Sequence, residues 1–426
     1  MSEVIGKKNG RNKRRIPRGS ALLTGLVGVM VLNMMVASYM SAIVSEKNMT
    51  ERTWSSMVAM NVAEAGAELA IWEISYGGSD FDAADGWAGV NPKTLSGTLS
   101  TSGGMVLGDY SISVQDPATN NSVVTVAGDV PNQAASVAQR TVQIEVGPEY
   151  LFSMAAFGRN GIRMSSNART DSFDSRIGDY GGGNVGSDGH VGTNSVLTSP
   201  AAIQLASNAS VAGAAYIGPG GDVNAAITTG SNAEITGGKY AMLEEIEVVS
   251  IDPPSGLPLC GALTLNGNST QTITTSGQYT SITLNSNSRL IISGDVEIYV
   301  TGNIALNSNS QIELTIGNEA QFYIDGGMTM NSNSRINNVG RDPTKLSIYG
   351  TDALTAGINF NSNSSLYGTI YAPNAPIAMS SNSVIYGSVF GSLVTLNSNA
   401  RIHFDKALEQ SGIIIGFSVF SWQEKN

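Results

Sequence analysis

The sequence predicts an α+β region, made of a long N-terminal helix and a small antiparallel sheet, followed by an all-β solenoid. Three observations support this prediction. An apolar run without charges spans residues 20–44 and continues as a helical pattern to about residue 76. Apolar and polar residues alternate between residues 104 and 147, as in half-buried strands. Beyond Pro148 a short asparagine-centred motif recurs, mostly at steps of 17 to 24 residues, which is typical of stacked coils.

Composition limits the classes of partner. The chain has 426 residues and a net charge of −11, and the first 19 residues, with seven bases and one acid, contribute +6. The remaining chain therefore carries −17, which argues against nucleic-acid binding because that needs a basic face. Cys260 is the only cysteine, so no internal disulfide stabilises the chain.

Residues 1–19 form a basic leader, and residues 20–44 are long enough to cross a bilayer as a helix. Because positive flanks stay in the cytoplasm, everything after Val44 is expected to be exported. A secretory signal peptide would have a shorter apolar core and a small-x-small cleavage site after it. A signal-anchor helix, with the membrane as its partner, is the plainest prediction.

The helical pattern continues beyond the membrane segment. Apolar residues recur three or four positions apart, and Gly77-Gly78 then ends the pattern. These apolar residues are Met57, Met60, Ala63, Ala67, Ala70, Ile71 and Ile74. Residues 20–76 therefore predict one helix of about 85 Å.

The run RGSALLTGLVGVMVLNMMVASYM and the later TERTWSSMVAMNVAEAGAELA resemble PilX-like minor pilins of type IV pili. Their signature includes the run Ala63-Glu64-Ala65-Gly66. The resemblance implies that a prepilin peptidase cleaves after Gly19, freeing and N-methylating Ser20. It implies other pilin-like subunits as partners, the inner membrane as the location of the precursor, and the pilus or cell surface after assembly.

One position departs from the pilin pattern. Pilins usually carry glutamate at the fifth mature position, where this chain has Thr24. In the family that glutamate pairs with the N-terminal amine of a neighbouring subunit. Some minor subunits at the top of a filament also lack it, so Thr24 is the candidate assembly position.

The predicted pilin head occupies residues 77–147. Residues 77–103 are rich in Gly, Ser and Asp and predict a loop. Three strands are expected after it, Tyr110–Val114, Ser122–Val126 and Arg140–Val146, with one face packed on the amphipathic half of the helix.

Residues 148–426 form the predicted solenoid domain, and a β-sandwich is the alternative architecture. Asparagine tolerates the left-handed backbone that tight corners need, and identical asparagines stacked coil on coil can bond to one another as a ladder. Steps of 41, 36 and 30 residues are expected to hold two coils or an insertion. The central asparagines are Asn167, Asn208, Asn232, Asn268, Asn287, Asn309, Asn333, Asn363, Asn382 and Asn399, and the ladder is predicted for the last six.

This region resembles the β-helical C-terminal domain that follows PilX-like N-termini in some bacterial surface proteins, and more distantly the bactofilin-type modules. That resemblance implies no catalytic residue. The run from Ile413 to Phe420 is too short to span a membrane and predicts a final strand that seals the open end of the solenoid.

No catalytic, cofactor-binding or metal-binding constellation stands out. Asp171, Asp174 and Asp179 lie close together without calcium-loop spacing, so a metal site competes with turn capping. His190 and His403 are predicted to be structural, and Cys260 a passive thiol.

Two functions remain. The first is a minor pilin-like subunit of a type IV pilus or related secretion filament, whose solenoid is a surface-exposed spacer or adhesive module that meets a surface polymer or glycan. The alternative is a membrane-anchored envelope protein that never assembles, whose solenoid self-associates or binds wall polymers. An anchored carbohydrate-active enzyme would need clustered acids and bases on the solenoid, and the sequence predicts no enzyme.

Overall fold

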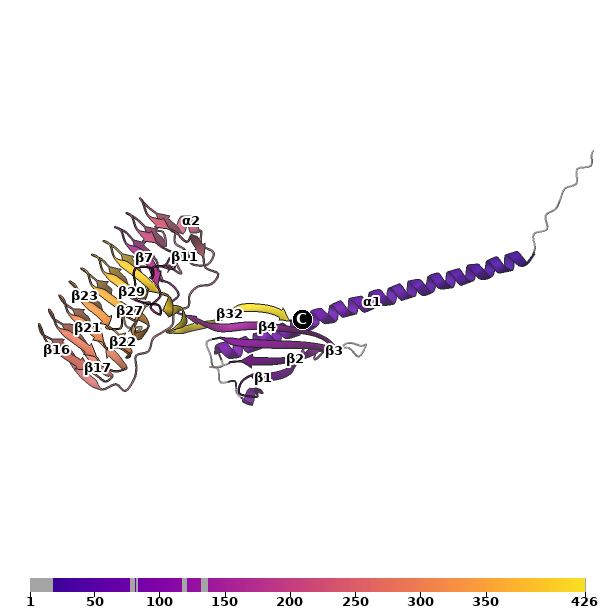
Figure 1. Ribbon diagram of the computed structural model, residues 1–426, viewed down its shortest axis with the longest axis horizontal. Helices are drawn as coiled ribbons and strands as arrows, with labels where there is room; N and C mark the ends of the chain where they lie inside the picture. Colours follow the sequence, from indigo (N-terminus) through magenta and orange to yellow (C-terminus); the bar gives the residue numbers. More distant parts are fainter. Residues whose placement is uncertain (1–17, 77–80, 82, 117–120, 132–136, 426) are drawn as a thin grey trace, which may run out of the picture. The chain divides into compact units, whose positions relative to one another are not determined.

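The computed structural model of the chain divides into two compact units (Figure 1). Unit 1 is Met1–Gly147 with Phe417–Asn426, and unit 2 is Pro148–Gly416. The residues that the structure describes are 18–76, 81, 83–116, 121–131 and 137–425. Most of the predicted basic leader, residues 1–17, lies outside them.

A single long helix dominates unit 1. Helix α1 spans Arg18–Tyr76, 59 residues, which corresponds to about 88 Å and confirms the predicted long helix. Large apolar side chains in its first part are exposed; Leu32 and Met34, for example, are 61% and 68% exposed. In the second part small residues are buried on one stripe against the sheet, among them Ala59, Ala63, Ala67 and Ala70. Helix α1 thus has one half that no part of the described chain covers and one half that is seated on the sheet.

The sheet of unit 1 has five strands in the order β1-β2-β3-β4-β32. The predicted strands are present as parts of β2, β3 and β4. The predicted loop at residues 77–103 is wrong in part. Strand β1 lies within this range and pairs antiparallel with β2. The sequence did not predict β1, because its serines, threonines and glycine give only a weak alternation of apolar and polar residues. The strand lies at a half-exposed edge of the sheet. The bounds are β1 Lys93–Ser100, β2 Val106–Gln115, β3 Ser122–Pro131, β4 Val137–Tyr150 and β32 Ile414–Lys425, with a short 3-10 helix η1 at Ala83–Asp85.

The predicted role of the C-terminal run, sealing the solenoid, is wrong. Strand β32 lies next to β4 in the sheet of unit 1, where Phe417 packs on the core beneath α1. The Arg140 guanidinium on β4 pairs with Glu424 at 2.6 Å and donates to Ser56 Oγ on α1 at 2.7 Å. Residues 417–426 therefore belong to unit 1, and unit 2 is an insertion between two neighbouring strands of one sheet.

Small residues set the distance between α1 and the sheet. A Cβ atom added to Gly128 on β3 would lie 2.2 Å from the Ala59 carbonyl oxygen and 2.6 Å from the Ala63 nitrogen. On the helix, a Cβ added to Gly66 would lie 2.7 Å from Cγ1 of Val126. The Ala-Glu-Ala-Gly run thus has a packing role here: its small ends allow the helix backbone to approach the strand backbone.

We expect Gly128→Val to destabilise unit 1 by about 3 kcal/mol or more, because the atoms that its side chain would meet are helix backbone and cannot rotate away. The matched control is Ser111→Val on the exposed face of β2, where a β-branched side chain is tolerated. Limited proteolysis of the full chain in detergent micelles, followed by mass spectrometry, checks the expectation. Equal resistance of residues 81–147 in both variants would contradict it.

Unit 2 is a β-solenoid of short parallel strands, as predicted (Figure 1). Its first arm consists of β5 Ala156–Gly158, β6 Ile162–Met164, β7 Arg169–Phe173, β8 Val191–Gly192, β9 Ile203–Leu205, β10 Ser210–Val211, β11 Ala215–Ile217, α2 Val223–Ala226, β12 Ile227–Thr229, β13 Glu234–Ile235 and β14 Lys239–Ala241. Its second arm consists of β15 Leu259–Leu265, β16 Thr270–Ile273, β17 Gly277–Leu284, β18 Arg289–Ile292, β19 Val296–Val300, β20 Ile304–Leu306, β21 Gln311–Leu314, β22 Ala320–Ile324, β23 Met328–Met330, β24 Arg335–Asn338, η2 Pro343–Lys345, β25 Leu346–Gly350, β26 Ile358–Phe360, β27 Ser365–Ala372, β28 Ile377–Met379, β29 Val384–Gly391, β30 Val394–Leu396, β31 Arg401–Asp405 and η3 Lys406–Gln410.

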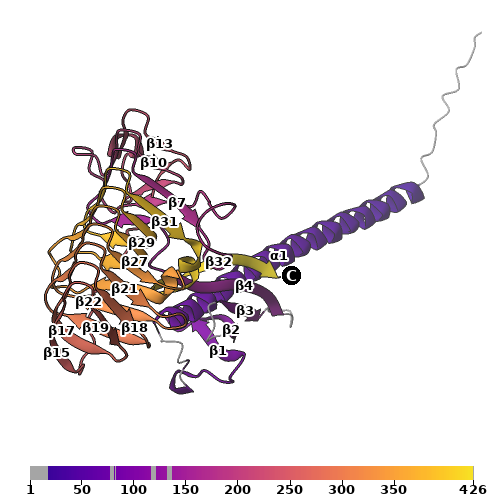
Figure 2. The same cartoon turned by 60° about the vertical axis from the view of Figure 1, so that its left-hand side comes forward.

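The two arms do not stack in sequence order. The chain enters the stack in its middle and winds through the first arm to one end. Residues 242–258, here named the crossing segment, then lead to the opposite end, and the second arm winds back until β29, β30 and β31 pair with β5, β6 and β7. Figure 2 shows β15 and β17 at one end and β10 and β13 at the other. Both ends of the insertion therefore lie in the middle of the stack, at a place here named the junction.

The long repeat steps hold insertions, not second coils. Strand β6 pairs directly with β9, so the 41-residue step contains one coil enlarged by the loop after β7. The 36-residue step holds the crossing segment, and the 30-residue step encloses η2 between directly paired coils.

Asparagine forms the corners. All ten central asparagines have positive φ, between 54° and 64°. Seven hydrogen bonds of 3.0–3.2 Å between side-chain amides join eight of them into one ladder. One of the seven crosses the junction, where the Asn167 amide donates to Asn399 at 3.1 Å. In stacking order the ladder runs Asn268, Asn287, Asn309, Asn333, Asn363, Asn382, Asn399 and Asn167.

Candidate ligand-binding groove

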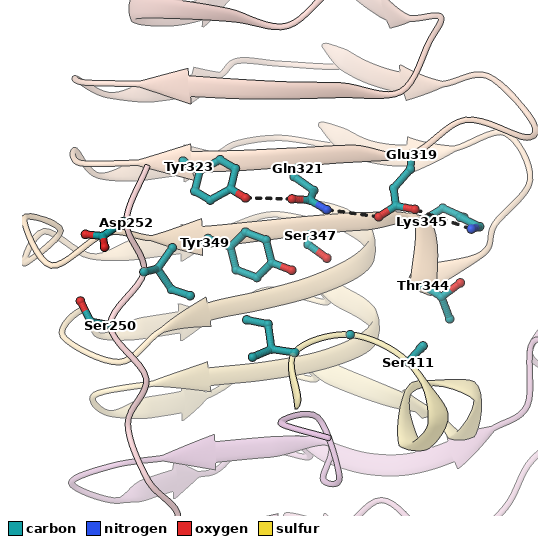
Figure 3. A pocket seen from close by; sticks show the side chains of 13 residues that line it. Ser250, Asp252, Glu319, Gln321, Tyr323, Thr344, Lys345, Ser347, Tyr349 and Ser411 are labelled. Carbon is teal, nitrogen blue, oxygen red and sulfur yellow. Dashed lines mark hydrogen bonds and ion pairs between the residues drawn. The ribbon is translucent and has the colours of Figure 1, made fainter. Parts of the chain in front are cut away.

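A groove of about 560 Å³ opens on the outer face of the second arm, within unit 2. Its floor comes from β22 and β25, one wall is the crossing segment, and another is the turn after η3 (Figure 3). The lining residues are Ser250, Ile251, Asp252, Glu319, Gln321, Tyr323, Thr344, Lys345, Ser347, Tyr349, Ser411, Gly412 and Ile413.

Aromatic side chains follow one register position through the stack. Tyr299 pairs with Tyr323, Tyr323 with Tyr349, and the column continues through Tyr371 to Phe390. The Tyr323 and Tyr349 ring centroids lie 5.3 Å apart at 42°. The column is covered at one end, where the Tyr371 hydroxyl donates to the Val249 carbonyl of the crossing segment at 2.7 Å. We name Tyr299 and Tyr323 the open tyrosines, because both side chains are partly exposed and the crossing segment does not seal that end of the column. Tyr349, between them and Tyr371, is only 8% exposed.

A chain of polar contacts runs beside the open tyrosines. Tyr323 OH donates to Gln321 Oε1 at 2.8 Å, Gln321 Nε2 donates to Glu319 Oε1 at 3.2 Å, and Glu319 lies 3.7 Å from Lys345 Nζ (Figure 3). Burial raises the pKa of Tyr323 to about 12, and burial together with the Asp325 carboxylate raises that of Tyr299 to about 12. Both phenols are therefore neutral hydrogen-bond donors at physiological pH.

Carboxylates dominate the electrostatics of this face. A neighbouring hollow of about 370 Å³ shares Glu319 and Gln321 with the groove and adds Ser276, Asp295, Val296 and Glu297 to the lining. With Asp252, four carboxylates line the two hollows, against the single ammonium of Lys345. The face therefore attracts cationic groups and repels anionic ones.

The three aspartates considered as a metal site have separate partners. Asp174 accepts two bonds of 2.8 Å from the Arg176 guanidinium, which holds its pKa below the usual value. Asp179 pairs with Arg341 at 2.7 Å, and Asp171 faces the interior of the junction. Among the described residues no group of three or more His, Cys, Asp or Glu side chains is placed to hold a metal ion.

The junction contains a buried polar cluster that the sequence did not reveal. Asp171 is fully buried and meets Nδ1 of His403, which is 2% exposed. The Tyr180 hydroxyl donates to Asp171 Oδ2 at 2.9 Å, and the Tyr180 ring stacks on His403 with centroids 3.7 Å apart. Burial, followed by this hydrogen bond, raises the pKa of Tyr180 to about 12. Asp171 and His403 are 232 positions apart, so only the pairing of β7 with β31 brings them together.

The remaining predicted residues are dispersed. His190 Nδ1 accepts the Ala214 backbone N–H at 2.9 Å, and the exposed Cys260 thiol donates to the Pro258 carbonyl at 3.4 Å. Gly19 and Ser20 lie in the first turn of α1, and Thr24 is exposed one turn later. The aromatic column was missed, although its tyrosines recur at steps of 24, 26 and 22 residues, which match the coil period.

Comparisons with known proteins cover part of the chain. Residues 260–411 match a protein family described as "Domain of unknown function (DUF7305)". These residues span the second arm and η3, including the floor of the groove. The competence-associated pilin ComZ from Thermus thermophilus is similar in a structure search, with 12% identity over 87% of this chain and 97% of that chain. Its TM-score of 0.23 is too low to bear on fold or function. The search among curated proteins found no significant match.

Proposed function

We propose that this chain is a minor pilin-like subunit of a type IV pilus or related secretion filament, and that it displays the solenoid as a surface-exposed adhesive module. The observation that carries the proposal is the two-part helix α1. Its described first part is long and apolar enough to cross a membrane, and none of the other residues that the structure describes covers it. Such a surface requires either lipid or apolar helices of neighbouring subunits around it.

The second half of α1 supports the same proposal. It is seated on a small sheet through the Ala63–Gly66 run, and that run is the part of the sequence that resembles the PilX-like signature. A helix that leaves the bilayer and ends in a compact head suits transfer from membrane to filament. The insertion point between β4 and β32 allows a large module to be added without interrupting the helix.

Thr24 determines the proposed placement. A threonine has no carboxylate to offer the N-terminal amine of a neighbouring subunit, so incorporation along the shaft is disfavoured. Placement at the leading end also relieves crowding, since unit 2 has more residues than unit 1. The alternative is an envelope anchor that never assembles. It is also consistent with Thr24, which offers no carboxylate for assembly, and it requires that the leader remain attached.

Processing at Gly19 tests the proposal. Mature protein is expected to begin at Ser20, and Gly19→Val is expected to abolish cleavage, because glycine lets the backbone lie extended in a narrow active site. The matched control is Gly25→Ala, also in the apolar half of α1, where an added Cβ meets nothing within 4 Å. Mass spectrometry of the N-terminal peptide from membranes and sheared filaments gives the answer. Mature material that begins at Met1 or Ser2 would replace the pilin proposal with the envelope anchor.

A further inference from the structure

We propose that the open tyrosines and the carboxylates around them bind a glycan chain of amino sugars. The proposal rests on the adhesive role proposed above and names the chemical class of its ligand. It depends on display of the solenoid outside the cell and not on assembly into a filament.

The floor of the groove offers flat apolar surface. The partly exposed rings of Tyr299 and Tyr323 occupy paired positions on neighbouring coils. The Tyr323 ring packs beside the buried ring of Tyr349, which supports it from the next coil (Figure 3). One face of a pyranose ring carries mainly C–H groups, which pack on aromatic rings. Because the coils are about 4.8 Å apart, the column presents successive rings to successive parts of an extended ligand.

The rim of the groove offers hydrogen-bonding groups to sugar hydroxyls. Glu319 is 44% exposed at its side chain, and Gln321, Ser347 and Thr344 lie along the same face (Figure 3). Carboxylates and amide oxygens accept from hydroxyls, and serine and threonine both donate and accept. A ligand with a flat apolar face and a polar edge therefore matches the floor and the rim together.

Charge selects among glycans. The carboxylates of Asp252, Asp295, Glu297 and Glu319 outnumber the ammonium of Lys345 on this face. Protonated amino groups on a sugar chain are attracted there, and uronic acids or phosphates are repelled. Amino sugars are thus favoured over neutral sugars, and acidic sugars are excluded.

A peptide is a weaker match. Strand β22 is already paired on both sides, with β19 and β25, so its edge cannot accept an added strand. Where the protein's own crossing segment does cover the column, it packs apolar side chains such as Val248 and Val249. The open tyrosines are flanked instead by carboxylates and hydroxyls, which leave an apolar peptide without partners.

Isothermal titration of the full chain tests the proposal, in a detergent without a sugar headgroup so that the micelle does not compete. The ligands are hexamers of glucosamine, N-acetylglucosamine and galacturonic acid, and hexalysine, at a mildly acidic pH that keeps amino groups protonated and carboxylates ionised. The glucosamine hexamer is expected to bind about tenfold more tightly than the acetylated hexamer, and its affinity is expected to fall with added salt. The galacturonic acid hexamer is expected not to bind. Hexalysine, which carries the positive charge but no flat ring face, is expected to bind at least about tenfold more weakly than the glucosamine hexamer.

Variants assign the binding to the groove. Tyr323→Ala is expected to weaken glucosamine hexamer binding about tenfold or more, and Glu319→Gln, on a part-exposed side chain that tolerates change, to reduce both affinity and salt dependence. Tyr240→Ala, at a half-exposed tyrosine of the first arm that also stacks on a neighbouring coil, is the matched control and should bind as the parent chain does.

The outcomes separate the proposals. Binding that survives Tyr323→Ala and Glu319→Gln, binding of hexalysine alone, or no binding of the amino-sugar chain overturns the glycan site. Equal affinity for the glucosamine hexamer and the N-acetylglucosamine hexamer overturns the proposed role of charge. Release of reducing ends that Glu319→Gln abolishes would show an enzyme instead of a binding site. Failure of leader cleavage leaves all these titrations unaffected, so it contradicts only the pilin proposal.

Discussion

Ile312→Asp is expected to unfold unit 2, at a cost of about 5 kcal/mol or more. Ile312 on β21 is fully buried, and it stacks between Leu290 of the preceding coil and Ile336 of the following one. An aspartate there would have neither water nor a partner for its charge. Because each coil buries its apolar face only against its neighbours, a defect in one coil exposes the next.

The matched control for this prediction is Arg289→Ala on the adjacent coil. Arg289 is half exposed and pairs with Glu313 at the surface, so its loss is expected to cost below about 1 kcal/mol. Circular dichroism of both variants during heating in detergent micelles makes the comparison. Similar melting temperatures for the two variants would argue against a stacked apolar core at this position.

Asp171→Ala is expected to destabilise unit 2 by about 3–5 kcal/mol, because it removes one member of a buried polar pair and leaves the other without a partner. Asp171 contacts His403 and Tyr180, both from the junction, and Arg169 approaches its Oδ2 at 3.2 Å. Its loss leaves the His403 nitrogen and the Tyr180 hydroxyl without their acceptor inside the stack. The two arms would then be held mainly by strand pairing.

Asp179→Ala provides the comparison, since Asp179 is 61% exposed and forms a surface pair with Arg341 in the same loop region. Its expected cost is below about 1 kcal/mol. Thermal unfolding, together with hydrogen exchange at β7 and β31, measures both the size and the place of the effect. If exchange at these strands is unchanged in Asp171→Ala, the cluster does not hold the junction.

Much of the candidate site lay within reach of sequence reasoning. The repeat steps predicted stacked coils, and the tyrosines at 299, 323, 349 and 371 follow those same steps. A register argument would have aligned them into one column. The walls of the groove were beyond such reasoning, because residues 250–252 and 411–413 belong to no repeat and meet the floor only through the path of the chain.

The sequence by itself determined the features that depend on near neighbours: the long helix, the alternating strands, and the corners at which asparagine adopts a left-handed backbone. Stacking order, the place of β32 and the Asp171–His403 contact were decided only by the tertiary structure. The physical reason is that every coil carries nearly the same motif, so any coil can pair with any other and the motif does not say which. The first and last residues of unit 2 connect to β4 and β32, which are neighbouring strands of one sheet. The chain therefore enters and leaves the stack at its middle, and residues 242–258 connect the two far ends of the stack.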